Sequence, residues 1–199
     1  MEVNFLYLIF VSYFIGSIPF AYILTKILGY GDIRKIGSGN IGATNVLRTG
    51  KKSLAITVLL LDILKGFLPV TLFSFFYVNQ FQLYESIFFG SYAIIGHIFP
   101  VWLKFKGGKG MATYIGFILG INYILGIICL LSWLTIACIK KYSSLASICS
   151  LIIIPLVSIL LNYDLKIIII LIFLSILIII KHSSNIKRLL SNSENKIKL

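Results

Sequence analysis

Long apolar runs with few charges are the feature that most restricts what this chain can fold into. They cover residues 4–28, 54–78, 86–102, 111–139, 145–161 and 165–180. Most approach or exceed the roughly 18 residues that mark a transmembrane helix. The runs are continuous rather than alternating, which argues against a β-barrel, and in lipid the backbone must satisfy its own hydrogen bonds. With 59% hydrophobic and 12% charged residues, the sequence predicts an all-α polytopic membrane protein, one domain over residues 1–199.

The segment 111–139 decides how many helices are expected. It is too short for two full crossings, which need roughly 40 residues, and too long for one. Four residues offer a place to break it: Gly116, Gly120, Asn122 and Gly126. Two short helices, or a hairpin that does not fully span, give about seven membrane or membrane-embedded helices. The alternative is six, with the lysine pair at 140–141 on the opposite side. In the first run, Gly16 and Pro19 are expected to produce a kink.

The basic residues predict the orientation of the chain. All lysines and arginines except Lys65 and Lys166 lie in four segments, 26–53, 104–110, 140–141 and the tail from 181. The positive-inside rule places these segments in the cytoplasm, with the N-terminus outside and the C-terminus cytoplasmic. Much of the net charge of +12 is thereby explained by orientation, and a share could bind anionic headgroups or an anionic substrate.

Three polar, cationic segments carry the candidate chemistry. They read GSGNIGATNVLR (37–48), KFKGGKG (104–110) and KHSSNIKRLLSNSENKIKL (181–199). Glycine lets backbone N–H groups turn toward an anion, arginine holds a phosphate through two hydrogen bonds, and a helix N-terminus after Gly110 attracts anions. Each segment alone could be a flexible loop or a basic anchor. Because all three are predicted on one membrane face, together they indicate one anion-binding site.

Other readings of these motifs fit less well. The pattern G-x-G-x-x-G at 37–42, with Asp62 further on, suggests a dinucleotide site, but membrane spans surround it instead of a βαβ unit. The segment 106–110 is no Walker A loop, because it lacks the first glycine and Gly110 stands where serine or threonine is required. No carboxylate pair or His/Cys cluster suggests a metal, and the three cysteines are expected to be packing residues.

Several ionisable residues lie within or just beyond the apolar runs. His97 is near the inner end of its span, where an ionisable residue is a functional hypothesis by default. Asp62 and Lys65 are three residues apart, a spacing that predicts an ion pair on one helix face. A structural pair is favoured, with Lys65 lining the site as the alternative. In the tail, His182, Asn185 and Arg188 recur every three residues and would share one face of a helical extension.

The segments 37–48, 96–113 and 182–196 resemble the hallmark segments of the bacterial membrane acyl-phosphate-dependent glycerol-3-phosphate acyltransferases. LLLDILKGFLPV and KKYSSLAS, between them, are also similar to family sequence. The resemblance implies an inner-membrane enzyme with a cytoplasm-facing site and no cofactor. It would transfer a fatty acyl group from acyl phosphate to the sn-1 hydroxyl of glycerol 3-phosphate, giving lysophosphatidic acid and phosphate in the first acylation of phospholipid synthesis. The implied partner is the soluble phosphate acyltransferase that makes the donor, and no nucleic acid is involved.

The resemblance also implies site residues. Catalytic roles fall to Ser38, Arg48, Lys106, His182 and Asn185, and substrate-binding roles to Gly37, Asn40, Asn45, His97, Gly107, Gly108, Lys109, Gly110 and Arg188. The general base stays open between His182 or Asn185 and a substrate phosphate oxygen. Glu194 is expected to be a structural partner of a basic loop. Asn192 departs from the family, which often has glycine there.

Two other function classes compete with the enzyme. A transporter or channel for organic phosphates would also need a basic site, but transporters usually place it near the midplane and show internal repeats. A lipid-binding scaffold would not require three separate glycine- or amide-bearing cationic segments. Detection of lysophosphatidate formation discriminates the enzyme from both.

Overall fold

The computed structural model describes residues 5–77, 79 and 81–197, and this part of the chain is helical without strands. The α-helices are α1 (Phe5–Ser17), α2 (Phe20–Ile27), α3 (Ala43–Leu47), α4 (Lys52–Phe76), α5 (Leu83–Ile98), α6 (Met111–Ile121), α7 (Tyr123–Lys140), α8 (Ser143–Leu160), α9 (Leu165–Lys181) and α10 (Ser183–Leu190). Two short 3-10 turns, η1 (Ile33–Lys35) and η2 (Val101–Leu103), lie in the loops after α2 and α5.

Among the described residues, four helical stretches are long and apolar enough to cross a membrane: α4, α5 with η2, α7 and α8. The pairs α1/α2 and α9/α10 also qualify, although they are bent by 40° and 62°. The apolar helix α6 is shorter, and counting it gives the seven membrane-embedded helices that the sequence predicts. The fold class is therefore confirmed.

The apolar segment 111–139 divides into two helices at Asn122, as predicted. Asn122 is extended and caps α7, and its side-chain oxygen accepts hydrogen bonds from the N–H groups of Ile124 (2.9 Å) and Leu125 (3.1 Å). These bonds satisfy two of the N–H groups that a helix start leaves without partners. The first arm, α6, has only 11 residues, or roughly 17 Å of helix. It is therefore shorter than a full crossing.

The predicted kink in the first apolar run is also present. Pro19 has no N–H to donate, and it separates α1 from α2. Gly16 serves a different purpose, since a Cβ atom there would lie 2.0 Å from the carbonyl oxygen of Ala93 on α5. The glycine therefore lets the backbones of α1 and α5 touch, a packing mode common in lipid.

Helices α4 and α6 approach equally closely through reciprocal glycines. A Cβ atom on Gly66 would lie 2.0 Å from the carbonyl oxygen of Thr113, and one on Gly116 would lie 1.8 Å from that of Ile63. No side chain fits at these two positions without moving the helices apart. The contact fixes where α6 begins, and with it the second basic loop.

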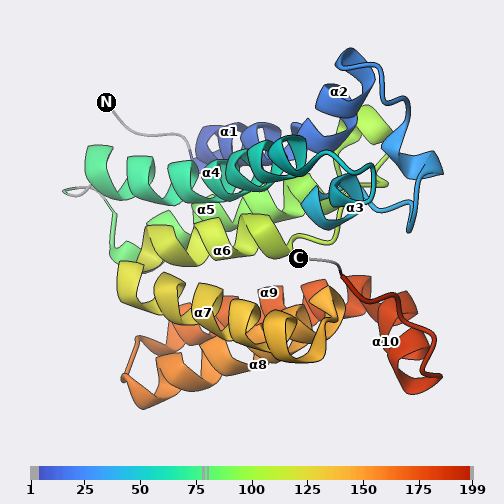
Figure 1. The fold of residues 1–199 in the computed structure, drawn as a ribbon. Helices are drawn as coiled ribbons and strands as arrows, with labels where there is room; N and C mark the ends of the chain where they lie inside the picture. Colours follow the sequence, from blue (N-terminus) through green and yellow to red (C-terminus); the bar gives the residue numbers. More distant parts are fainter. Residues whose placement is uncertain (1–4, 78, 80, 198–199) are drawn as a thin grey trace.

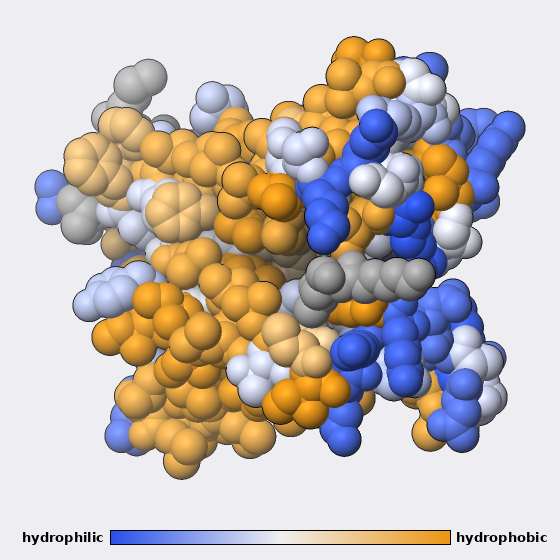
Figure 2. Space-filling model, viewed as in Figure 1, coloured by the Kyte–Doolittle hydropathy of each residue, from blue (hydrophilic) through white to orange (hydrophobic). Residues whose placement is uncertain are grey.

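The helices run back and forth so that all four basic segments lie at one end of the molecule. In Figure 1, α2, α3 and α10 lie at this end, together with the turn between α7 and α8. Hydrophilic side chains gather over the same end, while apolar side chains dominate the rest of the visible face (Figure 2). The charges thus leave the lipid-facing surface apolar. The assignment of this end to the cytoplasm stays a prediction of the positive-inside rule.

We expect Gly116→Ala to destabilise the protein. Alanine favours a helix over glycine by about 1 kcal/mol, but forcing a methyl group into a filled contact costs about 1–3 kcal/mol, and here the Cβ would meet backbone at 1.8 Å. Thermal unfolding in detergent should therefore show a lower midpoint. Leu64→Phe, on the exposed face of α4, is the control and should leave the midpoint unchanged. A Gly116→Ala midpoint at or above the wild-type value would refute the close contact.

Candidate active site

Asn45 on α3 holds the first loop in shape. Its side-chain oxygen accepts the Ser38 N–H at 3.0 Å. Its amide nitrogen lies 2.9–3.1 Å from three loop carbonyl oxygens, those of Ile33, Ile36 and Asn40. Asn45 is 1% exposed, and both of its polar atoms are engaged within the loop. It therefore supports the site by fixing the backbone at Ser38.

Two glycines let the first loop turn around Ser38. Gly37 and Gly39 have φ values of 56° and 70°, in the left-handed region that favours glycine. The Arg48 side chain folds back over the loop, because a Cβ on Gly37 would lie 2.8 Å from its Cδ and 3.2 Å from Nη1. The fold thus brings Arg48, at one end of the predicted motif, against Gly37 at the other end. The loop also carries Asn40, which is half-buried.

The second loop closes back onto the end of α5. Lys104 and Phe105 both adopt left-handed φ values, 52° and 61°, and reverse the chain. The N–H of Gly107 then donates to the Ile98 carbonyl at 3.1 Å, and the N–H of Gly108 donates to the His97 carbonyl at 3.1 Å. These two N–H groups are paired within the protein.

Close packing requires glycine at two positions of this loop. A Cβ on Gly107 would lie 2.1 Å from the His97 carbonyl oxygen, and one on Gly108 would lie 2.5 Å from the Ile41 carbonyl oxygen on the first loop. The two loops are therefore in contact. Gly110, with φ 98°, starts α6, while Lys106 on the same loop is exposed and Lys109 is half-buried.

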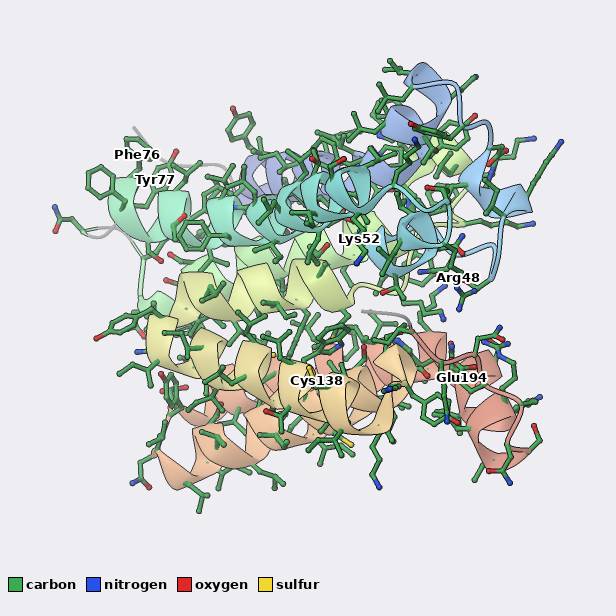
Figure 3. All side chains as sticks on the ribbon, viewed as in Figure 1. Arg48, Lys52, Phe76, Tyr77, Cys138 and Glu194 are labelled. Carbon is green, nitrogen blue, oxygen red and sulfur yellow. The ribbon has the colours of Figure 1, made fainter. Side chains whose placement is uncertain are left out.

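The tail is tied to the second loop by a network of hydrogen bonds. The Lys109 ammonium donates to the side-chain oxygen of Asn185. Asn185 and Ser144 both donate to Oε1 of Glu194, at 2.6 and 2.7 Å, and Arg188 donates to Oε2 at 2.6 Å. Glu194 is thus the centre of this network, and Arg188 of the tail is its basic partner. Figure 3 places Glu194 at the same end of the molecule as Arg48.

The charges at this end act on one another. Burial lowers the pKa of Lys109 to about 8; Glu194 opposes this shift, while Arg188 and Arg48 add to it. Partial burial alone would raise the pKa of Glu194, but hydrogen bonds from Asn185, Ser144 and Arg188 outweigh it, and its pKa lies below the ordinary value. Cations from the first loop and the tail therefore lie near Lys109, and Glu194 is the carboxylate among them, an arrangement suited to binding an anion.

His182 lies in the bend between α9 and α10. Its Nδ1 is 2.8 Å from the Ile178 carbonyl oxygen. A carbonyl only accepts, so Nδ1 carries the proton and Nε2 has a free lone pair in the neutral ring. Burial lowers the pKa of His182 to about 4, so the imidazole is neutral at pH 7. The unprotonated Nε2 can therefore accept a hydrogen bond.

Most of the predicted site residues come together at one end, and two features were not predicted from sequence. The first loop supplies Gly37, Ser38, Asn40, Asn45 and Arg48; the second supplies Lys106, Gly107, Gly108, Lys109 and Gly110; the tail supplies His182, Asn185 and Arg188. His97 lies beneath the second loop. The missed features are helix α3 and Ser144, whose hydroxyl binds Glu194. The segment KKYSSLAS was a signal for Ser144, since it resembles family sequence.

We expect Glu194→Gln to loosen the tail. The amide of glutamine lacks the negative charge that Glu194 places beside Arg188 and Lys109. A hydrogen bond to a charged group contributes about 2 kcal/mol. The thermal midpoint in detergent should fall. Glu85→Gln is the matched control, because Glu85 only caps the exposed start of α5. Glu85→Gln should unfold at the wild-type temperature. If Glu194→Gln also unfolded at that temperature, Glu194 would not hold the tail in place.

Comparison with known proteins identifies the family. Residues 6–192 match the family model described as "Glycerol-3-phosphate acyltransferase". Proteins of that name from Pelagibacter ubique and Mesorhizobium japonicum are 49% and 46% identical, each over 94% of this chain and over 95% and 92% of the relative.

Solved structures agree with the sequence relatives. The crystal structure of PlsY, an integral membrane glycerol 3-phosphate acyltransferase, in its glycerol 3-phosphate form superposes with a TM-score of 0.90 at 36% identity, over 98% of this chain and 96% of PlsY. Its lysophosphatidic acid form gives 0.87 at 35% identity, over 98% and 95%. The chain described here therefore belongs to the glycerol-3-phosphate acyltransferase family and is a membrane acyltransferase.

Proposed function

We propose that this protein transfers a fatty acyl group from acyl phosphate to the sn-1 hydroxyl of glycerol 3-phosphate, the first acylation step of phospholipid synthesis. The observation that carries the proposal is the convergence of cations at the polar end of a membrane bundle. Lys109 is linked through Asn185 and Glu194 to Arg188, and Arg48 lies near enough to act on the pKa of Lys109. The names of the relatives support the acceptor, and PlsY has a form with glycerol 3-phosphate and one with the product. The resemblance of the three motif segments to acyl-phosphate-dependent enzymes supports the donor.

The chemistry needs little from the protein beyond position and charge. An acyl phosphate is a mixed anhydride, so the glycerol hydroxyl attacks the acyl carbon directly. A carbon–oxygen bond to the hydroxyl forms, the bond to phosphate breaks, and phosphate leaves with the electron pair. The hydroxyl proton passes to a phosphate oxygen or to His182. The site must hold two anions side by side and stabilise the oxyanion that develops.

The three segments divide this work. We assign Ser38, Asn40 and Arg48 of the first loop, with Lys106 and Lys109 of the second, to the substrate phosphates and the developing oxyanion. A planar guanidinium binds two phosphate oxygens at once, whereas an ammonium acts as a point charge. The glycine-rich second loop faces the glycerol phosphate.

The tail orients the acceptor. His182 Nε2 is a free acceptor in the neutral ring, and it can orient the hydroxyl or take its proton. The side-chain oxygen of Asn185 accepts a hydrogen bond from the Lys109 ammonium. This bond connects the hydroxyl-orienting groups of the tail to the phosphate-binding loop. Arg188 supplies the third cation. A substrate phosphate oxygen is the other candidate base.

The location of the site fits a substrate pair of mixed character. The basic end would face the cytoplasm of the bacterial inner membrane, where glycerol 3-phosphate is soluble, and the acyl chain would reach the site from the bilayer between helices. The soluble phosphate acyltransferase that makes the donor is the implied partner. A phosphate transporter would instead place its site near the midplane, whereas hydrophilic side chains gather at one end of this molecule (Figure 2).

The proposal is tested with purified protein in detergent micelles or lipid mesophase. Glycerol 3-phosphate is supplied with either palmitoyl phosphate or palmitoyl-CoA, and phosphate release and lysophosphatidate are followed together. We expect phosphate and lysophosphatidate to form in equal amounts when palmitoyl phosphate is the donor, and neither to form when palmitoyl-CoA is the donor. Activity with palmitoyl-CoA would assign a different donor class, and silence of folded protein with both donors would favour transport, tested by glycerol phosphate flux.

Arg48→Lys should reduce kcat/KM by about a hundredfold, because one lysine cannot reproduce a two-point contact with phosphate. Arg34→Lys is the matched control. Arg34 lies on the exterior of the same loop region, where it pairs with Asp32 at 2.6 Å, and its replacement should leave turnover close to wild type. Wild-type turnover in Arg48→Lys would remove Arg48 from the site.

The alkaline side of the pH profile should report Lys109. Its ammonium form is present below a pKa of about 8 and is lost as the pH rises through that value. The KM for glycerol 3-phosphate should then rise by up to about tenfold per pH unit. Lys109→Arg keeps its charge at every pH, so its KM should stay flat between pH 7 and 9. The same rise in Lys109→Arg would assign the titration to another group.

A further inference from the structure

A buried cluster of three ionisable side chains lies beneath the two loops and is not used by the reaction described above. Asp62 and Lys65 of α4 are paired, with Lys65 Nζ 2.8 Å from Asp62 Oδ1. His97 of α5 faces the same carboxylate oxygen at 3.7 Å. All three side chains are at most 7% exposed. Charges buried in this way are costly unless they are paired, so the cluster needs an explanation beyond packing.

One side of the cluster holds the break between α1 and α2. Lys65 Nζ donates to the carbonyl oxygen of Ile18 at 2.8 Å. Ile18 directly precedes Pro19, where the helix is interrupted and carbonyl groups lose their partners. Helix α2 leads from this break into the first loop. Lys65 therefore sets the direction in which the first loop leaves the membrane bundle.

The other side of the cluster supports the second loop. The His97 carbonyl accepts the Gly108 N–H at 3.1 Å. The imidazole packs under the same residue, since a Cβ on Gly108 would lie 2.2 Å from His97 Nε2. Gly108 in turn touches the Ile41 backbone of the first loop. Through His97, the Asp62–Lys65 pair is thus in contact with both loops.

The space between the cluster and the loops is too small for a substrate. The cavity lined by Asp62, Lys65, His97, Gly107 and Gly108 measures about 10 Å³, which is about the room that one water molecule needs. Neither glycerol phosphate nor an acyl phosphate reaches these side chains there. Any effect of the cluster on the reaction must pass through the loops.

We propose that Asp62, Lys65 and His97 are positioning residues that fix the second loop against the first and thereby set the affinity for glycerol phosphate. The proposal rests on the proposed function, in which the second loop faces that substrate. In this proposal, His97 does not contact the substrate directly but supports the second loop from beneath. A purely structural pair would change the amount of folded enzyme and leave both KM values unchanged, and this difference makes the proposal testable.

The first test uses Asp62→Asn, Lys65→Met and the double variant in the full-length protein in detergent. For each, kcat, the KM for glycerol 3-phosphate, the KM for palmitoyl phosphate and the thermal midpoint are measured. Each single variant leaves one buried partner without its counter-charge, and we expect the KM for glycerol 3-phosphate to rise roughly tenfold or more. The KM for palmitoyl phosphate should stay near the wild-type value. The double variant should recover part of the loss, because no isolated charge remains.

A second variant keeps the test decisive if the ion-pair variants fail to fold. His97→Asn retains a side-chain amide toward Asp62 but removes the ring from beneath Gly108. It should keep a thermal midpoint near wild type and still raise the KM for glycerol 3-phosphate several-fold. Ser150→Ala is the matched control. Its hydroxyl bonds Ser132 at 2.9 Å between α7 and α8, away from the loops, so its loss should lower the midpoint without moving either KM.

The outcomes separate this proposal from the proposed function. Folded Asp62→Asn and His97→Asn with unchanged KM for glycerol 3-phosphate, or with both KM values raised equally, would overturn the positioning role. If the wild type showed no turnover with acyl phosphate, the proposed function would fail instead. Calorimetric titration with glycerol 3-phosphate alone would then test the cluster, since weakened binding in the two variants still supports it and unchanged binding refutes it.

Discussion

The exclusion of charge from lipid is the constraint on which the rest of this structure depends. A bilayer leaves no partner for an isolated ion or an open backbone group, so the spans are helical and the cations of four segments gather at one end. A charge that does lie within a helical span needs a partner of opposite charge. Lys65 lies within α4 with Asp62 at 2.8 Å. The crowding of glycine loops and cations at one end is therefore a consequence of the membrane, and it assembles the candidate anion-binding site.

Much of the fold could be predicted because its breaks have local causes. Pro19 cannot continue a hydrogen-bond ladder, and Asn122 is a strong helix cap, so both interruptions could be predicted from a few neighbouring residues. Helix α3 could not be predicted in this way. It has five residues and depends on Asn45, whose amide reaches Ile33 twelve positions earlier in the chain. A pattern search over adjacent residues does not reveal a partner at that distance.

The gathering of the candidate site residues at one end was predictable from the sequence, and the structural reasons for individual residues were less so. Glycines 107 and 108 were expected to bind glycerol phosphate, yet their N–H groups donate to carbonyl groups of α5. Glycine is needed at both positions because His97 and Ile41 leave no room for a side chain. A sequence does not distinguish a glycine chosen for its torsion angles from one chosen for its size. Glu194 has the opposite character. Its role as a partner of basic residues was expected, but its hydrogen bond from Ser144 became visible only in three dimensions.

The charge balance of the assembled end has a further consequence for binding. Arg188 and Arg48 both act on Lys109, and Glu194 is the carboxylate that opposes their effect there. Burial is the largest cause of the lowered pKa of Lys109, and Arg188 and Arg48 add to it, because bringing like charges together costs free energy. An anionic ligand removes that cost when it binds, so binding and folding stability are linked. In the proposed arrangement, the glycine contacts of α6 and the Asp62–Lys65 pair support the loops that carry these cations before the ligand binds.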